Sequence, residues 1–231
     1  MLSLLDLIDV GSVDLPMAAY LAAAMRSGAS LLVGANPGGA GKTAVMGALI
    51  NFLPDDTIIR PVTHRGVLPG ARGPEKPGDV CYLAHEIGAG SYYAYIWDRE
   101  ARAFFAAAAQ GHIVASNLHA DTLAETRDQL CGQNGVPIVH LDAVDLKLYL
   151  GVERTRGWRM HRWVRRVYES DGTGDCLLWT QEAQGASAQQ SPEESALVSS
   201  GQVQVYAEFL TDLLRQDVCR IEDVRRALIT L

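Results

Sequence analysis

Short apolar runs alternate with longer helical patterns over the first 135 residues. The apolar runs have the length of strands and show no polar face, which is typical of parallel strands buried on both sides. We predict strands at residues 30–35, 57–62, 80–84 and 112–118. We predict helices at residues 2–10, 15–26, 43–53, in the second half of 91–110, and at 123–133. This alternation predicts an α/β fold with a mostly parallel sheet flanked by helices.

After Pro137 the pattern changes. Residues 138–172 alternate between apolar and polar positions, which predicts β-strands with a turn near Arg156 and Gly157. Residues 176–179 predict another short strand. Residues 182–201 are rich in Ser, Gln, Ala and Glu, which predicts a flexible linker before two short helices. The predicted divisions are an N-terminal core with a helical lead-in, a β-rich continuation, the linker and a C-terminal helical cap, at residues 1–135, 136–181, 182–201 and 202–231.

A glycine-rich segment, NPGGAGKT, lies between the first predicted strand and the helix that follows it. It matches the phosphate-binding pattern G-x-x-x-x-G-K-[ST] except that Asn36 stands at the first glycine. Asn is among the few residues that tolerate a positive φ, so this departure is mild. A plain glycine turn with a surface lysine is the alternative, but the strand before it and the helix after it favour a phosphate site.

Bare main-chain amides at a helix N-terminus form a ready site for an anion, and glycines let phosphate oxygens come close. Lys42 is expected to reach the β- and γ-phosphates of ATP, and the Thr43 hydroxyl to ligate Mg²⁺. The expected nucleotide-binding residues are Asn36, Pro37, Gly38, Gly39, Ala40, Gly41, Lys42, Thr43 and Ala44.

Two polar residues end later predicted strands. Glu86 follows VCYLAH and is a candidate to activate or orient water, although a lone acid at a strand end is usually just solvated. His119 follows the strand HIVASNL, at the strand end where ligands bind in open α/β sheets, although a lone histidine is more often structural. Both are predicted catalytic residues because of the glycine-rich segment beside them.

These residues resemble the secretion-type ATPases of type II and type IV secretion, pilus assembly and retraction, archaeal flagella and conjugation. NPGGAGKT stands where that family has G-P-T-G-S-G-K-T, and GHIVASNLHAD stands where it has a histidine box ending in T-L-H-A-N. The lead-in before the glycine-rich segment and a Gly-x-Arg turn near Trp158 are also similar, so the resemblance covers roughly residues 4–180.

The resemblance implies a RecA-like P-loop NTPase core with a C-terminal β-hairpin region. It implies that Glu86 polarises water and that His119 senses the γ-phosphate. It further implies a hexameric ring with nucleotide at the subunit junctions and arginines from the neighbour. The implied partner is a membrane-embedded secretion or pilus component, which places the protein in the cytoplasm, at the inner face of the membrane.

Several positions depart from the family pattern. An acidic box is expected after the second strand, but RPVTHRGVL carries no acid, and Thr63, His64 and Arg65 stand there. Asn117 replaces a threonine and Asp121 an asparagine. Only 30 residues precede Leu31, so we expect no large N-terminal domain. A nucleotide-binding regulatory or assembly protein with little hydrolysis therefore remains an alternative, as does a small-molecule kinase, for which no lid signature is present.

Composition and charge limit the classes of partner that this protein can bind. The net charge of −7 argues against a protein that coats nucleic acid, although an Arg-rich stretch occurs at residues 154–166. That stretch is either a solvated face or a source of one phosphate-binding arginine, and Arg60, Arg65 and Arg127 are equally arguable. Four widely spaced cysteines and an acidic start without a signal pattern indicate a reducing, cytoplasmic setting.

Overall fold

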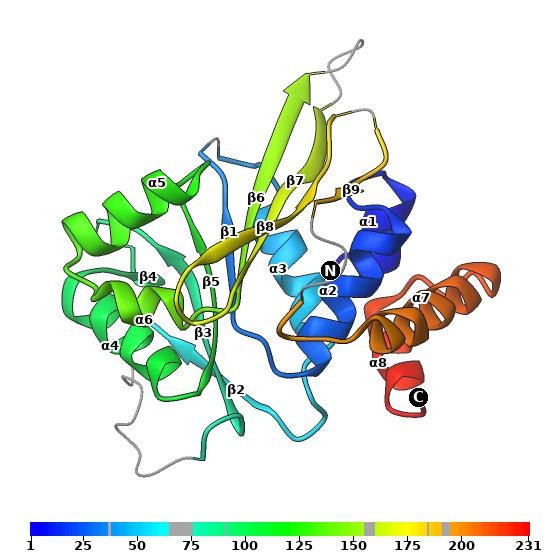
Figure 1. Ribbon diagram of the computed structural model, residues 1–231, viewed down its shortest axis with the longest axis horizontal. Coiled ribbons are helices and arrows are strands. Elements are labelled where there is room, and N and C mark those ends of the chain that lie inside the picture. Colours follow the sequence, from blue (N-terminus) through cyan, green and yellow to red (C-terminus); the bar gives the residue numbers. More distant parts are fainter. Residues whose placement is uncertain (37, 65–75, 91, 155–159, 184, 191–194) are drawn as a thin grey trace.

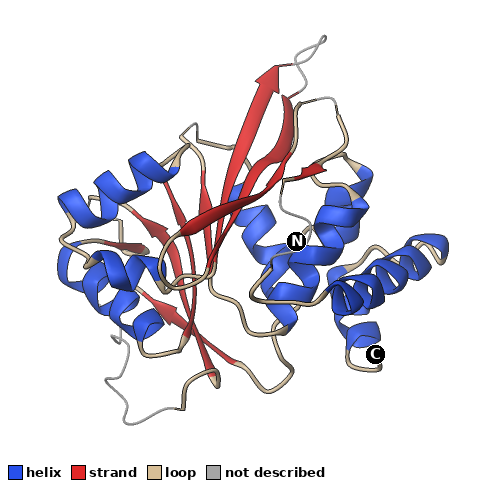
Figure 2. Cartoon of the chain, viewed as in Figure 1, coloured by secondary structure: helices blue, strands red, loops and turns tan. Residues whose placement is uncertain are grey.

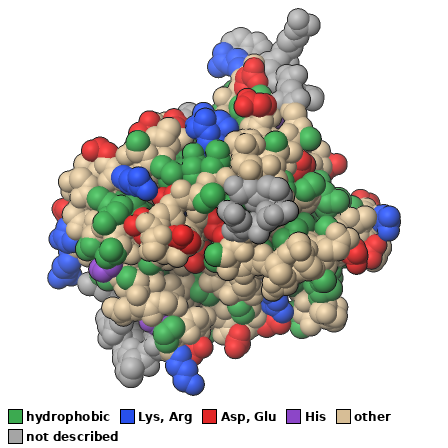
Figure 3. Space-filling model, viewed as in Figure 1, with side chains coloured by type: hydrophobic (Ala, Val, Ile, Leu, Met, Phe, Trp, Pro, Cys, Tyr) green, Lys and Arg blue, Asp and Glu red, His purple; other side chains and the backbone are tan. Residues whose placement is uncertain are grey.

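The computed structural model describes residues 1–36, 38–64, 76–90, 92–154, 160–183, 185–190 and 195–231. Within these ranges the chain forms one large mixed sheet with helices on both of its faces (Figure 2). On the face seen in Figure 3, acidic, basic and hydrophobic side chains are interspersed.

Five strands in the order β2-β3-β5-β1-β6 run parallel, and β7, β8 and β9 continue the sheet in antiparallel pairing (Figure 1). The short β4 pairs with β3 in parallel, outside this path. The strands are β1 (Leu31–Gly34), β2 (Ile58–Val62), β3 (Val80–Ile87), β4 (Tyr95–Ile96), β5 (Ile113–Leu118), β6 (Leu146–Arg154), β7 (Met160–Ser170), β8 (Asp175–Thr180) and β9 (Ala188–Gln189).

The helices cover two separate cores. One core lies under α1, α2, α3, α7 and α8, and the other under α4 and α6 (Figure 1). Alternate residues of β1 face the two cores: Leu31 and Val33 lie in the first, and Leu32 in the second. The helices are α1 (Leu4–Asp9), α2 (Leu15–Arg26), α3 (Lys42–Ile50), α4 (Asp98–Ala109), α5 (Leu123–Arg127), α6 (Ile138–Asp142), α7 (Ser200–Arg215), α8 (Ile221–Leu228) and a π-helical segment, Asp128–Gln133.

The predicted α/β class and the mostly parallel sheet are confirmed, as are the strands and helices predicted before residue 135. One prediction is wrong: residues 138–142 form the short helix α6, not a strand. Pro137 precedes this helix and accepts a hydrogen bond from the amide of His140, which closes the first turn. Ile138 and Val139 are exposed, so their β-branched side chains gain no strand packing to oppose the turn.

The predicted hairpin strands are present as β6 and β7, and the turn near Arg156 and Gly157 lies outside the described residues. Most of the predicted loop at residues 64–79 also lies outside them. In the segment predicted as a linker, Ser195 donates to the buried Glu169, which also accepts a hydrogen bond from Tyr20 on α2. Burial, and then the neighbouring Glu169, raise the pKa of the Tyr20 phenol.

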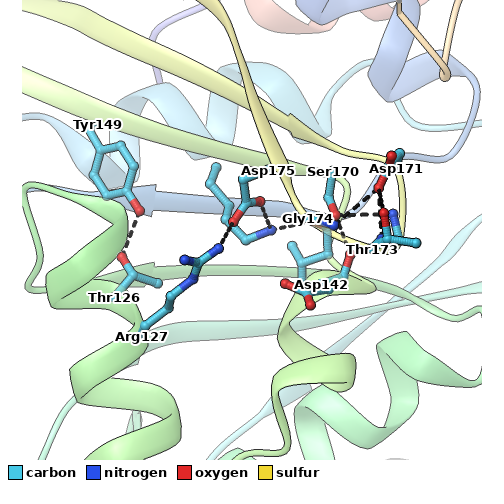
Figure 4. Close-up of polar contacts among 12 residues, drawn as sticks. Thr126, Arg127, Asp142, Tyr149, Ser170, Asp171, Thr173, Gly174 and Asp175 are labelled. Carbon is cyan, nitrogen blue, oxygen red and sulfur yellow. Dashed lines mark hydrogen bonds and ion pairs between the residues drawn. The ribbon is translucent and has the colours of Figure 1, made fainter.

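A buried charge network ties β6 to β8 (Figure 4). Lys147 is 1% exposed, and its Nζ donates to Asp175 Oδ1 at 2.7 Å and to the carbonyl of Val144 at 2.8 Å. Arg127 on α5 reaches the other oxygen of Asp175 at 3.3 Å. Burial lowers the pKa of Lys147, and the charge of Asp175 opposes that shift. The ammonium therefore depends on Asp175 as its counter-charge.

Asp175→Asn is expected to lower the free energy of unfolding by about 3–5 kcal/mol, because it leaves a buried charge without its partner. The loss is expected to be larger at neutral than at alkaline pH, since an unpaired Lys147 with a lowered pKa sheds its proton as the pH rises. Urea unfolding at both pH values measures this.

Asp212→Asn is the control, because Asp212 pairs with Arg215 on an exposed helix surface and is expected to change stability by less than about 0.5 kcal/mol. The double variant Lys147→Met with Asp175→Leu is expected to recover most of the lost stability. An Asp175→Asn protein as stable as the parent would contradict the role given to this pair.

Candidate functional site

The glycine-rich loop joins the end of β1 to the start of α3. Gly39 and Gly41 have φ angles of +76° and +96°, which favour glycine, and no side chain caps α3. A Cβ atom added at Gly38 or Gly39 would meet nothing within 4 Å, so open space lies over the loop. Pro37, a predicted binding residue, lies outside the described residues. The uncapped helix start and the space above it leave room for an anion.

Lys42 points back beneath the loop. Its Nζ atom donates to the carbonyl of Ala35 at 3.1 Å and lies 2.9 Å from Oε1 of Glu86. Lys42 is 9% exposed and Glu86 is 8% exposed. The two charges compensate each other where water has little access, which is the arrangement that makes a buried ion pair tolerable.

Glu86 lies near the carboxyl end of β3. The register between β3 and β5 shifts between Ala84 and Ile87, and such irregularities re-aim side chains. Oε1 of Glu86 lies 3.2 Å from Nε2 of His119, which follows β5. The negative charge of Glu86 raises the pKa of the Tyr95 phenol, with smaller contributions from burial and a hydrogen bond between the two side chains. Glu86 thus meets a lysine, a histidine and a tyrosine from three different segments.

Thr43 lies beside a second residue of β5. Its Oγ1 is 3.4 Å from Nδ2 of Asn117, which donates a closer hydrogen bond to the carbonyl of His85 at 2.8 Å. The Oδ1 atom of Asn117 is buried and has no hydrogen-bond partner among the described residues. Asn117 was noted in the sequence only as a departure from the family pattern. Its position between two strand ends makes it part of the site.

The start of the loop is tied to the segment after β5. The amide of Asn36 donates to Asp121 Oδ1 at 2.8 Å, and the amide of Asp121 donates to Glu125 Oε2 at 2.6 Å. The sequence did not indicate Glu125, because only the folding of the chain brings α5 to the loop. A recess of about 770 Å³ opens at this edge, and Asn36, Tyr95, His119 and Glu125 are among the residues that line it.

Two arginines of β7 form hydrogen bonds to main-chain carbonyls of the glycine-rich loop and of the segment after β5. Nε of Arg162 donates to the carbonyl of Gly39 at 2.7 Å, and Nη2 of Arg165 donates to the carbonyl of Asp121 at 2.9 Å. Arg127, an equal candidate in the sequence, pairs with Asp175 instead, and Arg65 lies outside the described residues. Within the described part of the Arg-rich stretch, residues 160–166, Arg162 is the residue that contacts the loop.

Two oxygen atoms of the site have the chemistry of magnesium ligands, and an acid is missing. The Thr43 hydroxyl oxygen and the unpartnered Oδ1 of Asn117 are of the kind that ligates Mg²⁺ or accepts a hydrogen bond from its bound water. No acid follows β2, where Thr63 and His64 stand. Within the described ranges, no group of three His, Cys, Asp or Glu side chains could hold a metal ion by itself. The phosphates would have to supply most of the ligands, as is usual for Mg²⁺.

No family model and no curated protein matches this sequence. One solved structure that is similar is the VirB11 ATPase of the Brucella suis type IV secretion system, determined in complex with sulphate. The similarity has a TM-score of 0.46 and 20% sequence identity, and it covers 72% of this chain. This chain spans 54% of the length of that protein.

None of the helices in the described part of the chain is both long and apolar enough to cross a membrane.

Glu86→Gln is expected to lower the pKa of Tyr95 toward the ordinary tyrosine value of about 10, because the carboxylate charge that raises it is removed. Ultraviolet absorbance of tyrosinate across alkaline pH measures this, and subtracting the curve of a Tyr95→Phe variant isolates the residue. Glu208→Gln, at an exposed position of α7, is the control. A titration curve that Glu86→Gln leaves unchanged would contradict the contact between the two side chains.

Proposed function

We propose that this chain binds ATP with Mg²⁺ at residues 36–44 and hydrolyses it with the help of Glu86. The observation that carries the proposal is the contact between Lys42 and Glu86, at 2.9 Å, under an open glycine-rich loop. A lysine at a helix start and an acid at a nearby strand end are two of the charged groups that triphosphate hydrolysis uses.

Binding uses the loop and the start of α3. The main-chain amides around Gly39 and Gly41 surround the phosphates, and Lys42 neutralises their charge. Thr43 and Asn117 are the residues that would hold the metal ion, directly or through its water. Mg²⁺ supplies neutralisation of the phosphate charge when it is bound. Because Lys42 is paired with Glu86 without ligand, an incoming phosphate competes with the carboxylate for the same ammonium.

Hydrolysis uses the other end of the site. Once Lys42 turns to the phosphate, Glu86 has lost the cation beside it and accepts a proton from water, or orients that water. His119 remains within contact distance of the carboxylate and is exposed enough to meet the terminal phosphate. Tyr95, the partner of Glu86 in the register of β3 and β4, lies beside the carboxylate on the neighbouring strand. When the γ-phosphate is bound or released, the contacts of these residues change, and the loops that carry them shift with them.

The sequence resemblance to secretion and pilus motor ATPases supports a motor role, in which nucleotide state drives conformational change. Two contacts provide the coupling: Asn36 to Asp121 on the loop after β5, and Gly39 to Arg162 on β7. A ring of copies, and a membrane-embedded secretion or pilus component contacted from the cytoplasmic side, complete this proposal.

A second candidate function is nucleotide binding with little turnover, in a regulatory or assembly protein. It is favoured by the segment after β2, where Thr63 and His64 replace the acids that help position metal and water in the family that the sequence resembles. The two functions share the phosphate site and differ in what Glu86 achieves.

Lys42→Ala is expected to weaken ATP binding by about 10- to 100-fold, because one charge-assisted contact to phosphate is lost. Isothermal titration calorimetry with Mg²⁺ and a non-hydrolysable ATP analogue measures this. Lys76→Ala removes an exposed lysine far from the loop in sequence and is the matched control. Equal affinity of Lys42→Ala and the parent would exclude a phosphate site at this loop.

Glu86→Gln is expected to keep nucleotide affinity within a few-fold and to lower the rate of phosphate release by about 100-fold or more, because the proton acceptor is lost. Phosphate release under saturating MgATP measures the rate. If the parent protein binds ATP without turnover, and sediments as a monomer with and without nucleotide, the second candidate function replaces the first.

A further inference from the structure

We propose that the base of the bound nucleotide occupies a cavity between α1, the glycine-rich loop and the β6–β7 hairpin, and that this cavity accepts either purine by shape. The inference rests on the proposed function, since it assigns the part of the nucleotide that the phosphate site leaves unplaced.

The direction of the nucleotide follows from the side chains of α3. Lys42 turns toward Glu86 on β3, and Thr43 toward Asn117 on β5. The terminal phosphate therefore belongs on the β3–β5 side of the loop. In the sheet, β6 and β7 lie on the opposite side of β1. A nucleotide that passes its phosphates over the loop must leave its base on the β6–β7 side.

A cavity of about 280 Å³ lies on that side, and its wall includes Ala40, Gly41 and Ala44 of the phosphate site. Its volume is near the lower limit of pockets for drug-sized ligands, about 300–1,000 Å³, so it suits one ring system and not a whole nucleotide. The rest of its wall comes from Val45 of α3, from α1 with its flanking residues, and from the hairpin. The cavity and the loop are thus parts of one continuous surface.

Exposed apolar side chains surround the opening of the cavity. Leu2, Val10 and Met160 line it and are 45%, 55% and 40% exposed, which places three large apolar side chains from two segments around one opening. Leu7 and Val45 line its buried part. An aromatic base with apolar faces would cover these side chains, and their burial would contribute to affinity.

Three donors in the wall form hydrogen bonds to main-chain carbonyls. The hydroxyl of Ser12 donates to Arg162, Arg162 Nε donates to Gly39, and the indole of Trp163 donates to Gln181. His161 is stacked on Trp163, with 5.5 Å between ring centroids and 10° between planes. The donors that remain, on the His161 imidazole and the terminal nitrogens of Arg162, can bind the N7 acceptor that adenine and guanine share, so both purines are accepted and the smaller pyrimidines fill the cavity less well.

The test separates base binding from phosphate binding by using ATP, GTP and inorganic tripolyphosphate as probes, each with Mg²⁺, in calorimetry on the full chain. The parent is expected to bind ATP and GTP within about five-fold of each other, and tripolyphosphate at least ten-fold more weakly. Val10→Asp, which places a charge in the apolar wall, and Met160→Trp, which fills the opening, are each expected to weaken ATP ten-fold or more and to leave tripolyphosphate unchanged.

Val205→Asp, at an exposed valine of α7, is the matched control and is expected to leave both affinities unchanged. A measurement on the parent alone covers the case of a variant that misfolds: ATP is expected to change tryptophan fluorescence through Trp163, and tripolyphosphate is not.

The outcomes separate the two proposals. If tripolyphosphate binds as tightly as ATP, or if the cavity variants weaken both probes equally, the base site is wrong and the phosphate site stands. If neither probe binds the parent, both proposals fail. A preference for GTP or ATP above about 100-fold would overturn recognition by shape.

Discussion

The carboxyl ends of three parallel strands, β1, β5 and β3, meet at one edge of the sheet, and the candidate site depends on this arrangement. Lys42 follows β1, His119 follows β5, and Glu86 lies near the end of β3. Parallel strands bring such ends together because every strand leaves the sheet in the same direction. Because β5 lies between β1 and β3, Lys42 reaches across the end of β5 to contact Glu86. His119 follows β5 itself and contacts the same carboxylate.

The charges at this edge are balanced inside the protein before any ligand arrives. Lys42 and Glu86 are both nearly buried, and either one alone would be costly there. A phosphate would take over the role of Glu86 as the counter-charge of Lys42 and leave the carboxylate to interact with water or with His119. The same buried contact that makes the empty site stable would in this way link nucleotide binding to the state of the proposed proton acceptor. Lys147 and Asp175 form a comparable buried pair, which ties β6 to β8.

The loop has partners on both sides, and they give the proposed nucleotide its orientation. On one side Asn36 is bonded to Asp121, next to a recess that Tyr95 and His119 line. On the other side Gly39 is bonded to Arg162, next to an apolar cavity that α1 closes. One side is rich in polar groups and suits the transfer of a phosphate to water. The other is apolar and suits a flat ring.

The sequence by itself determined the elements that local physics controls. Short apolar runs bounded by turn residues favoured buried strands. The glycines at 39 and 41 allowed the positive φ angles of a loop that ends at a helix, so Lys42 and Thr43 could be placed from the pattern alone. It failed at residues 138–142, where Pro137 and exposure of Ile138 and Val139 outweighed β-branched character. Only the tertiary structure decided the order of the strands, and with it the contacts of Glu86 with Lys42, His119 and Tyr95 and of Arg162 with Gly39. Arg162 and Gly39 are 123 residues apart, and no local pattern encodes such a contact, because it depends on which strands pair and in which register.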